Sequence, residues 1–184
     1  MNSTLVSPWL EPTLGYWTLA DLDALPDEMR CEIVDGALLV SPSPVSRHQW
    51  VAGEVLAQLR DALPHGLTTM GEMNVGLGRT VRRPDGLVVL RPAALTAVKA
   101  LDPADLVLAV EVESRSSLSQ DRILKPREYA AAGIPCYIRI ELEPEVRIIV
   151  HELRDGAYEV IAEGDVVSAD LPVPCTIDLR GLLD

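Results

Sequence analysis

The segment DLVLAVEVESRSSLSQDRILK, residues 105–125, decides the fold that we expect for this chain. It begins with the apolar run LVLAV, which is typical of a buried β-strand. Glu111 and Glu113 follow, and they should point the same way because side chains alternate between faces along a strand. Two acids at the end of a buried strand repel each other and are costly to desolvate. The segment therefore predicts a compensating group, such as a divalent metal.

Length and composition indicate one soluble domain. The chain has 184 residues, of which 48% are hydrophobic and 24% are charged, as in an ordinary globular protein. No basic segment precedes an apolar core at the N-terminus, and the apolar runs are too short to span a membrane. The three cysteines, Cys31, Cys136 and Cys175, show no CxxC spacing and are expected to be reduced thiols. We therefore expect a cytoplasmic protein.

The net charge of −12 argues against a protein that coats nucleic acid, because phosphate backbones favour basic surfaces. The charge is unevenly distributed, however. Residues 61–135 hold nine acids and nine bases, whereas both ends of the chain are strongly acidic. A local basic path across residues 79–127 is therefore compatible with the sequence.

The N-terminal half predicts alternating helices and strands. Residues 18–25 are expected to form a short helix with Thr18 as its N-cap. Residues 31–42 predict a hairpin that turns at Asp35-Gly36. An amphipathic helix is expected over 45–63, followed by strands over 67–77 and 85–90 that a basic loop, 78–84, connects.

The C-terminal half continues the pattern. A loop or short helix, 91–104, precedes the buried strand 106–112, and a helix follows over 118–132, where Pro126 must kink or restart it. Three strands are expected over 135–142, 145–153 and 157–164, and a tail that covers a sheet edge and adds a helical turn. These elements predict one mixed α/β (α+β) domain, residues 1–184, in which helices flank a mixed β-sheet.

Carboxylates from two apolar strands suggest a metal site. Asp85 precedes the strand LVVL, and Glu111 and Glu113 end the other strongly apolar strand. If these strands pair, their oxygen ligands suit Mg²⁺ or Mn²⁺, which could act on a phosphodiester. Lys125 could orient the attacking water or stabilise the transition state. The chain has only two lysines against fourteen arginines. Because arginine does not substitute freely for a compact ammonium group, a lysine at this position is less easily explained as a random surface charge.

Each residue also has a simpler interpretation. Pro-Asp-Gly is a common turn signal, so Asp85 is alternatively a turn residue. Glu113 could point to solvent where its strand ends, and Lys125 could be a solvated charge on a helix. Glu111 lies deeper in the apolar run and is hardest to explain without a function.

Several short motifs, in order, resemble the Uma-two family of putative restriction endonucleases, which have the PD-(D/E)xK nuclease-like fold. The resemblance covers about residues 16–152. The matching positions are Cys31 to Gly36, Ser41 to Pro44, His48-Gln49, Arg83-Pro84-Asp85, Asp105-Leu106-Val107, Glu111, Ser114, Asp121-Arg122, Lys125, Tyr129 and Ala132 to Pro135.

The resemblance implies a restriction-endonuclease-like core and a nuclease site with Asp85 and Glu111 as metal-binding acids. In the wider fold a lysine lies two residues after the glutamate, where this chain has Glu113, which implies a further metal ligand. The family often carries its lysine on the following helix, which Lys125 matches. Gly86 departs from the family pattern, in which a bulky apolar residue follows the aspartate.

Two further residues match family positions. Glu32 is expected either to add a carboxylate near the metal or to face solvent from its strand. His48 is expected either to contact the scissile phosphate or a metal ligand, or to cap the helix at the surface. The basic residues expected to contact nucleic acid are Arg82, Arg83, Arg115 and Arg122.

The function expected from residues and resemblance together is Mg²⁺- or Mn²⁺-dependent hydrolysis of DNA phosphodiester bonds. Asp85, Glu111, Glu113 and Lys125 would form the catalytic group. Family analogy adds a homodimer, since duplex cleavage needs two active sites. Two alternatives stay open: an inactive nuclease-like fold that serves as a nucleic-acid-binding or regulatory module, and an enzyme that hydrolyses a smaller phosphate ester.

Overall fold

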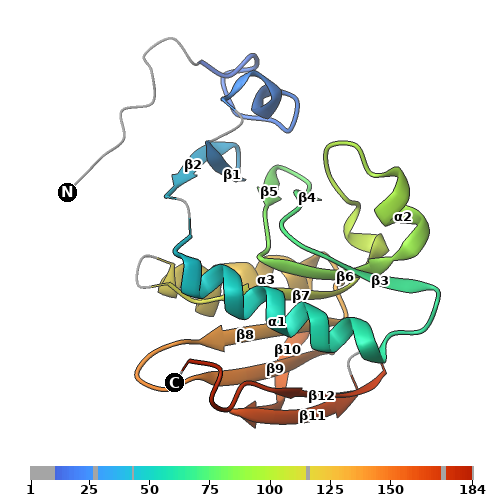
Figure 1. Ribbon diagram of the computed structural model, residues 1–184. Coiled ribbons are helices and arrows are strands. Elements are labelled where there is room, and N and C mark those ends of the chain that lie inside the picture. The colour runs from blue at the N-terminus through green and yellow to red at the C-terminus, as the bar shows by residue number, and fades with distance from the viewer. Residues whose placement is uncertain (1–10, 27–28, 43, 115–116, 171–172, 184) are drawn as a thin grey trace.

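The structure, a computed structural model, describes residues 11–26, 29–42, 44–114, 117–170 and 173–183. Its centre is a six-stranded sheet in the order β10-β9-β8-β7-β6-β3 (Figure 1). The strands are β3 (Leu67–Met70), β6 (Gly86–Leu90), β7 (Leu106–Val112), β8 (Cys136–Glu141), β9 (Arg147–Arg154) and β10 (Ala157–Gly164). β7 and β8 are parallel and the other neighbouring pairs are antiparallel. The expected mixed sheet is confirmed.

Helices cover both faces of this sheet, which explains the apolar run in β7. α1 (Ser46–Ala62) packs on one face, where Leu108 of β7 belongs to its buried cluster. α3 (Lys125–Ala131) packs on the other face, where Ala109 and Tyr129 share a second cluster. Because alternate residues of β7 enter two cores, the strand needs apolar residues at successive positions.

A second sheet of four strands has the order β2-β1-β5-β4. Its strands are β1 (Arg30–Val34), β2 (Ala37–Ser41), β4 (Val75–Leu77) and β5 (Thr80–Arg82). β1 and β2 form the predicted hairpin, and the φ angles of Asp35 (48°) and Gly36 (83°) suit its two-residue turn. The predicted strand 67–77 is in fact two strands, β3 and β4, which lie in different sheets.

The basic segment 78–84 is not wholly a loop, as expected, because its middle forms strand β5. Val81 pairs with Ile33 of β1, and both side chains are buried. Gly78, with φ of 73°, allows the tight connection between β4 and β5. Three residues are too few for an alternating pattern to identify a strand from sequence.

The predicted helix 118–132 is divided at its middle. Residues Gln120–Leu124 form a π-helical turn, η3, in which the Lys125 N–H bonds to the Gln120 carbonyl. α3 begins there, with Pro126 in its first turn, where a missing N–H costs little. Of the two effects expected of Pro126, a kink or a restart, the structure shows the restart.

The other helical predictions have mixed outcomes. α1 lies within the predicted 45–63. The segment 18–25 contains only a 3₁₀ turn, η1 (Asp21–Ala24), and Thr18 is not its cap, because its hydroxyl donates to the Asp21 carboxylate. α2 (Arg91–Thr96) and the 3₁₀ turn η2 (Pro103–Asp105) lie within the expected loop or short helix. None of the described helices is long and apolar enough to cross a membrane.

The C-terminal tail, expected to cover a sheet edge and to add a helical turn, forms a strand. It contributes β12 (Pro174–Asp178), which pairs with β11 (Val166–Asp170) in a separate two-stranded sheet. This hairpin covers α1: Gln58 of α1 bonds to the Asp178 backbone, and Ile177 is buried in the α1 cluster. Among the described strands, neither β11 nor β12 extends the six-stranded sheet.

Candidate functional site

A cavity of about 710 Å³ opens where the end of β7 meets the start of α1, strand β2 and η3. Five polar side chains at one end of it form what we call the cavity floor: Arg30, His48, Asp85, Glu111 and Lys125. Glu32, Glu113 and Arg122 also line the cavity. Residues from distant parts of the sequence, including the predicted Asp85, Glu111 and Lys125, therefore meet in one place.

Asp85 reaches the cavity because it immediately precedes β6, which pairs with β7. Its Oδ2 accepts the Val112 N–H at 2.8 Å, and its Oδ1 accepts Arg30 Nη2 at 2.8 Å. His48 Nε2 lies 3.2 Å from Asp85 Oδ2 and 2.7 Å from the Val112 carbonyl. These contacts fix the carboxylate between two strands and a helix, and they place His48 inside the protein and not at a helix cap.

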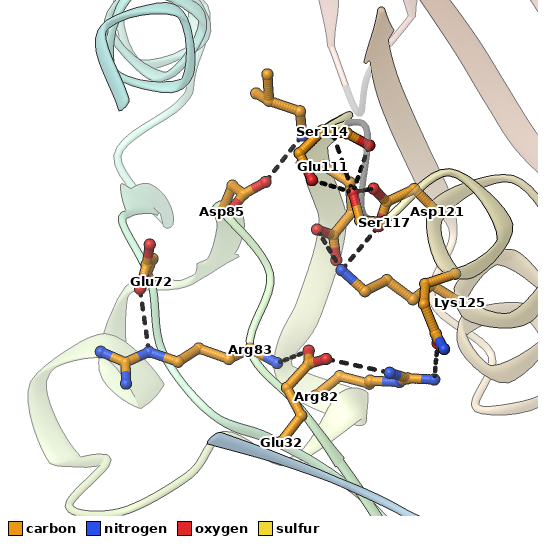
Figure 2. A network of polar contacts seen from close by, with 12 residues as sticks. Glu32, Glu72, Arg82, Arg83, Asp85, Glu111, Ser114, Ser117, Asp121 and Lys125 are labelled. Carbon is orange, nitrogen blue, oxygen red and sulfur yellow. Dashed lines mark hydrogen bonds and ion pairs between the residues drawn. The ribbon is translucent and has the colours of Figure 1, made fainter. Parts of the chain in front are cut away.

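Glu111 and Lys125 form a buried ion pair on the opposite side of the floor (Figure 2). Lys125 Nζ lies 2.7 Å from Glu111 Oε2 and 2.9 Å from Asp121 Oδ1. The other Glu111 oxygen accepts the Tyr129 hydroxyl at 2.7 Å. Glu111 and Asp121 are each 1% exposed and Lys125 is 6% exposed, so the ammonium serves two desolvated carboxylates.

Burial and charge act in opposite directions on these groups. Burial raises the pKa of Glu111 well above its usual value, and the nearby Asp85 and Asp121 charges add to the effect despite Lys125. Burial also opposes ionisation of Asp85, but the His48 hydrogen bond and the His48 and Lys125 charges outweigh it, so the pKa of Asp85 is lowered. Although burial disfavours its charge, Glu111 and Asp121 raise the pKa of Lys125, which stays an ammonium ion.

Glu113 shares the α3 face of β7 with Glu111, as predicted, but it contacts different partners. Arg122 binds it in a bidentate arrangement, Nε to Oε1 and Nη2 to Oε2, each at 2.7 Å. Arg139 of β8 also pairs with Oε1. Glu113 therefore does not point to solvent. Arg122 and Arg139 already bind its oxygens, which makes them less available to a metal.

Glu32 lies beside the floor and is held by the neighbouring strand. Its Oε1 accepts the Arg83 N–H at 2.9 Å, and its Oε2 lies 3.1 Å from Arg82 Nη1 (Figure 2). Arg82 also donates to Glu128 of α3 from Nε (2.6 Å) and Nη2 (2.9 Å), and to Gln120 at 3.1 Å. This arginine joins the second sheet to the segment that carries Lys125.

The arginines expected to contact nucleic acid have different surroundings. Arg82 is 0% exposed and its guanidinium faces protein carboxylates, so the expectation that it contacts DNA is wrong. Arg83 pairs with Glu72 at 3.2 Å and does not line the cavity. Arg122 lines the cavity and is half-exposed while it binds Glu113. Arg115 lies outside the described residues.

Three residues that contact the charged groups of the cavity floor were not expected from the sequence to have a chemical role. Asp121 and Tyr129 hold Lys125 and Glu111, respectively, and both belong to the short motif that also contains Lys125. Their helical spacing from Lys125, four residues on either side, was the available signal. Arg30, which binds Asp85, had no such signal because 55 residues separate the two in the chain.

Comparisons with known proteins identify the family and the fold. The Uma2 family model, described as "Putative restriction endonuclease", matches residues 19–180. A crystal structure of "a putative nuclease" from Anabaena variabilis aligns with a TM-score of 0.61 and 17% sequence identity, covering 83% of this chain and 88% of that one. No curated protein matches. The fold is that of restriction-endonuclease-like proteins, and the chain belongs to the Uma2 family.

Proposed function

We propose that this protein is a divalent-cation-dependent nuclease that hydrolyses phosphodiester bonds in DNA. One observation carries the proposal: the Asp85 and Glu111 carboxylates, from adjoining strands, line the same cavity as a buried ammonium group, Lys125. Family membership supports the same reaction class. Buried charged groups that line a cavity and have shifted pKa values are characteristic of reaction sites.

The donor set suits Mg²⁺ or Mn²⁺. Within the described residues, no three His, Cys, Asp or Glu side chains form a ready-made metal site. Mg²⁺ commonly uses only one or two carboxylates and completes its shell with water and substrate phosphate. Asp85 and Glu111 would supply those two carboxylates. A cation there would offset the burial and the neighbouring negative charges that together raise the pKa of Glu111.

The residues of the floor would then have separate roles. A bound cation would neutralise phosphate charge and make water a better nucleophile. Lys125 is not a general base, since its raised pKa keeps it protonated. Its ammonium group has three N–H donors, of which one bonds to Glu111 Oε2, while Asp121 Oδ1 lies 2.9 Å from the same nitrogen as an ion-pair partner. An N–H that Glu111 does not use can donate to a phosphate oxygen as negative charge develops. His48 and Arg30 position Asp85.

Nicking of supercoiled plasmid in Mg²⁺ or Mn²⁺ tests the proposal. Asp85→Asn and Glu111→Gln should each slow nicking by about a hundredfold or more, as expected when a charge-stabilising group is removed from a reaction site. Glu163→Gln is the matched control, because Glu163 forms an exposed ion pair with Arg147 outside the cavity. Circular dichroism should show that each variant is folded.

Isothermal titration with Mn²⁺ separates cation binding from cleavage. Asp85→Asn should abolish Mn²⁺ binding, whereas Glu113→Gln should retain it because Glu113 faces Arg122 and Arg139. A wild-type protein that binds DNA but nicks it in neither cation would contradict the proposal and favour the non-catalytic binding module.

A further inference from the structure

Three of the described basic side chains that line the cavity are already paired with carboxylates of the protein itself. Arg30 pairs with Glu72 and Asp85, and Lys125 with Glu111 and Asp121. Arg122, at the margin, binds Glu113 and Glu141. A surface that binds duplex DNA needs many cations free to neutralise phosphates. Together with the net charge of −12, these pairings leave few described cations near the cavity that could neutralise a long phosphate backbone.

Arg47 differs from these groups. It lines the cavity, is exposed, and donates to the Leu142 carbonyl at 3.2 Å. No ion pair joins it to a carboxylate within the part of the chain that the structure describes. One such cation at the cavity margin suits one phosphate group of a ligand.

Apolar side chains also line the cavity. We call them the apolar wall, which consists of Leu39, Pro42, Pro44, Val45, Leu118 and Leu142. Leu118 and Val45 are 42% and 69% exposed, so part of this wall faces solvent in the free protein. A cavity that has both apolar and charged lining residues suits a ligand with one flat apolar part and one anionic part. A nucleotide has this division between its base and its phosphate.

The dimensions and depth of the cavity restrict the form of that nucleotide. A volume of about 710 Å³ is typical of a site for a small molecule, not for a double helix. The floor is also deep, since Glu111 is 1% exposed. A base that stays paired and stacked in a duplex keeps its phosphate on a rigid backbone and cannot lie against the wall.

We infer that the cavity takes a single unpaired nucleotide, with its base against the apolar wall and its phosphodiester at the floor, so that single-stranded DNA is the preferred substrate. This inference rests on the proposed nuclease function and defines its substrate class. Contact between a base and an apolar side chain tolerates any sequence, so the preference should depend on strandedness more than on base identity.

Fluorescence anisotropy tests this with a short labelled oligothymidylate and a blunt duplex of equal length. Ca²⁺ replaces Mg²⁺ because it takes the same oxygen ligands, so that binding is measured on the wild-type protein. The single strand should bind about tenfold more tightly, within the range for one base contact. Because few phosphates are contacted, log K should fall with log salt with a slope of about −1.

Variants identify the two parts of the cavity. Leu118→Asp should weaken single-strand binding at least about fivefold, whereas Leu95→Asp, on an exposed leucine of α2 outside the cavity, should not. Arg47→Gln should reduce the steepness of the salt slope by about 0.7, and Arg154→Gln, which does not line the cavity, should leave it unchanged.

Equal or tighter binding of the duplex, a slope steeper than about −5, or no binding of either probe would overturn the inference. The outcome is independent of the proposed reaction. Cleavage of duplex without single-strand preference contradicts the substrate class alone, and single-strand preference without cleavage in Mg²⁺ or Mn²⁺ contradicts the reaction alone.

Discussion

Replacement of Arg82 with methionine should destabilise the protein strongly, although sequence alone places this residue in a basic surface segment. Arg82 is 0% exposed and pairs with Glu32, which is itself buried, and with Glu128. Removing one partner of a buried ion pair costs about 3–5 kcal/mol, because the other charge stays desolvated. The Glu128 side chain is 23% exposed and can regain water, so we expect the lower end, about 3 kcal/mol.

Thermal and urea unfolding followed by circular dichroism measure this effect. For a chain of this length, 3 kcal/mol corresponds to a Tm about 6–12 °C lower. Arg83→Met is the matched control, since Arg83 is partly exposed and pairs only with Glu72 among the described ion pairs. A partly exposed pair of this kind is expected to contribute about 1 kcal/mol or less.

A double variant separates the ion pair from the packing of the long side chain. If the Glu128 carboxylate causes much of the cost, Glu128→Gln combined with Arg82→Met should destabilise less than the sum of the single variants. Loss of less than about 1 kcal/mol in Arg82→Met, or an equal loss in Arg83→Met, would refute the reasoning from burial.

Two further predictions concern the interior. Lys125→Met should cost about 3–5 kcal/mol at neutral pH in EDTA, because Glu111 and Asp121 lose their cation. Glu111 has a raised folded-state pKa, so it favours folding below its ordinary pKa and loses that contribution as pH rises. The loss of unfolding free energy in Lys125→Met, measured by urea unfolding, should therefore shrink toward about pH 4. A loss that does not depend on pH would contradict this account. Gly86→Ala should lower unfolding free energy by about 1–3 kcal/mol, because its Cβ would lie 2.7 Å from Leu56 Cδ2 of α1. Gly53→Ala, which meets nothing within 4 Å, should be neutral or stabilising by up to about 1 kcal/mol in the same assay.

The elements that local pattern specifies could be predicted from the sequence. The apolar run of β7, the Asp35-Gly36 turn and the restart at Pro126 depend on residues close together in the chain. The separate four-stranded sheet could not be predicted, because β5 is three residues long and its pairing with β1 depends on a contact between Ile33 and Val81. Such pairings are set by the whole fold and leave no periodic signal.

The candidate site shows the same division between local and distant information. Glu111 could be identified because an acid within an apolar strand needs an explanation. The close approach of Leu56 to Gly86 gives a physical reason for the residue that departs from the family pattern. The partners of Glu113 could not be foreseen, since Arg139 lies on the next strand of the sheet, 26 residues away.

The arginine that sequence alone assigned to DNA instead determines where Lys125 lies. Its guanidinium bonds to Gln120 and Glu128, which precede and follow Lys125 on η3 and α3. Through Glu32 it also holds one side of the cavity. A fully desolvated charge with three protein partners is costly to assemble, and it is stable only when all the partners are in place. Because these partners come from the second sheet and from both halves of the helical segment, folding of the distant hairpin is physically coupled to the position of the ammonium group in the cavity.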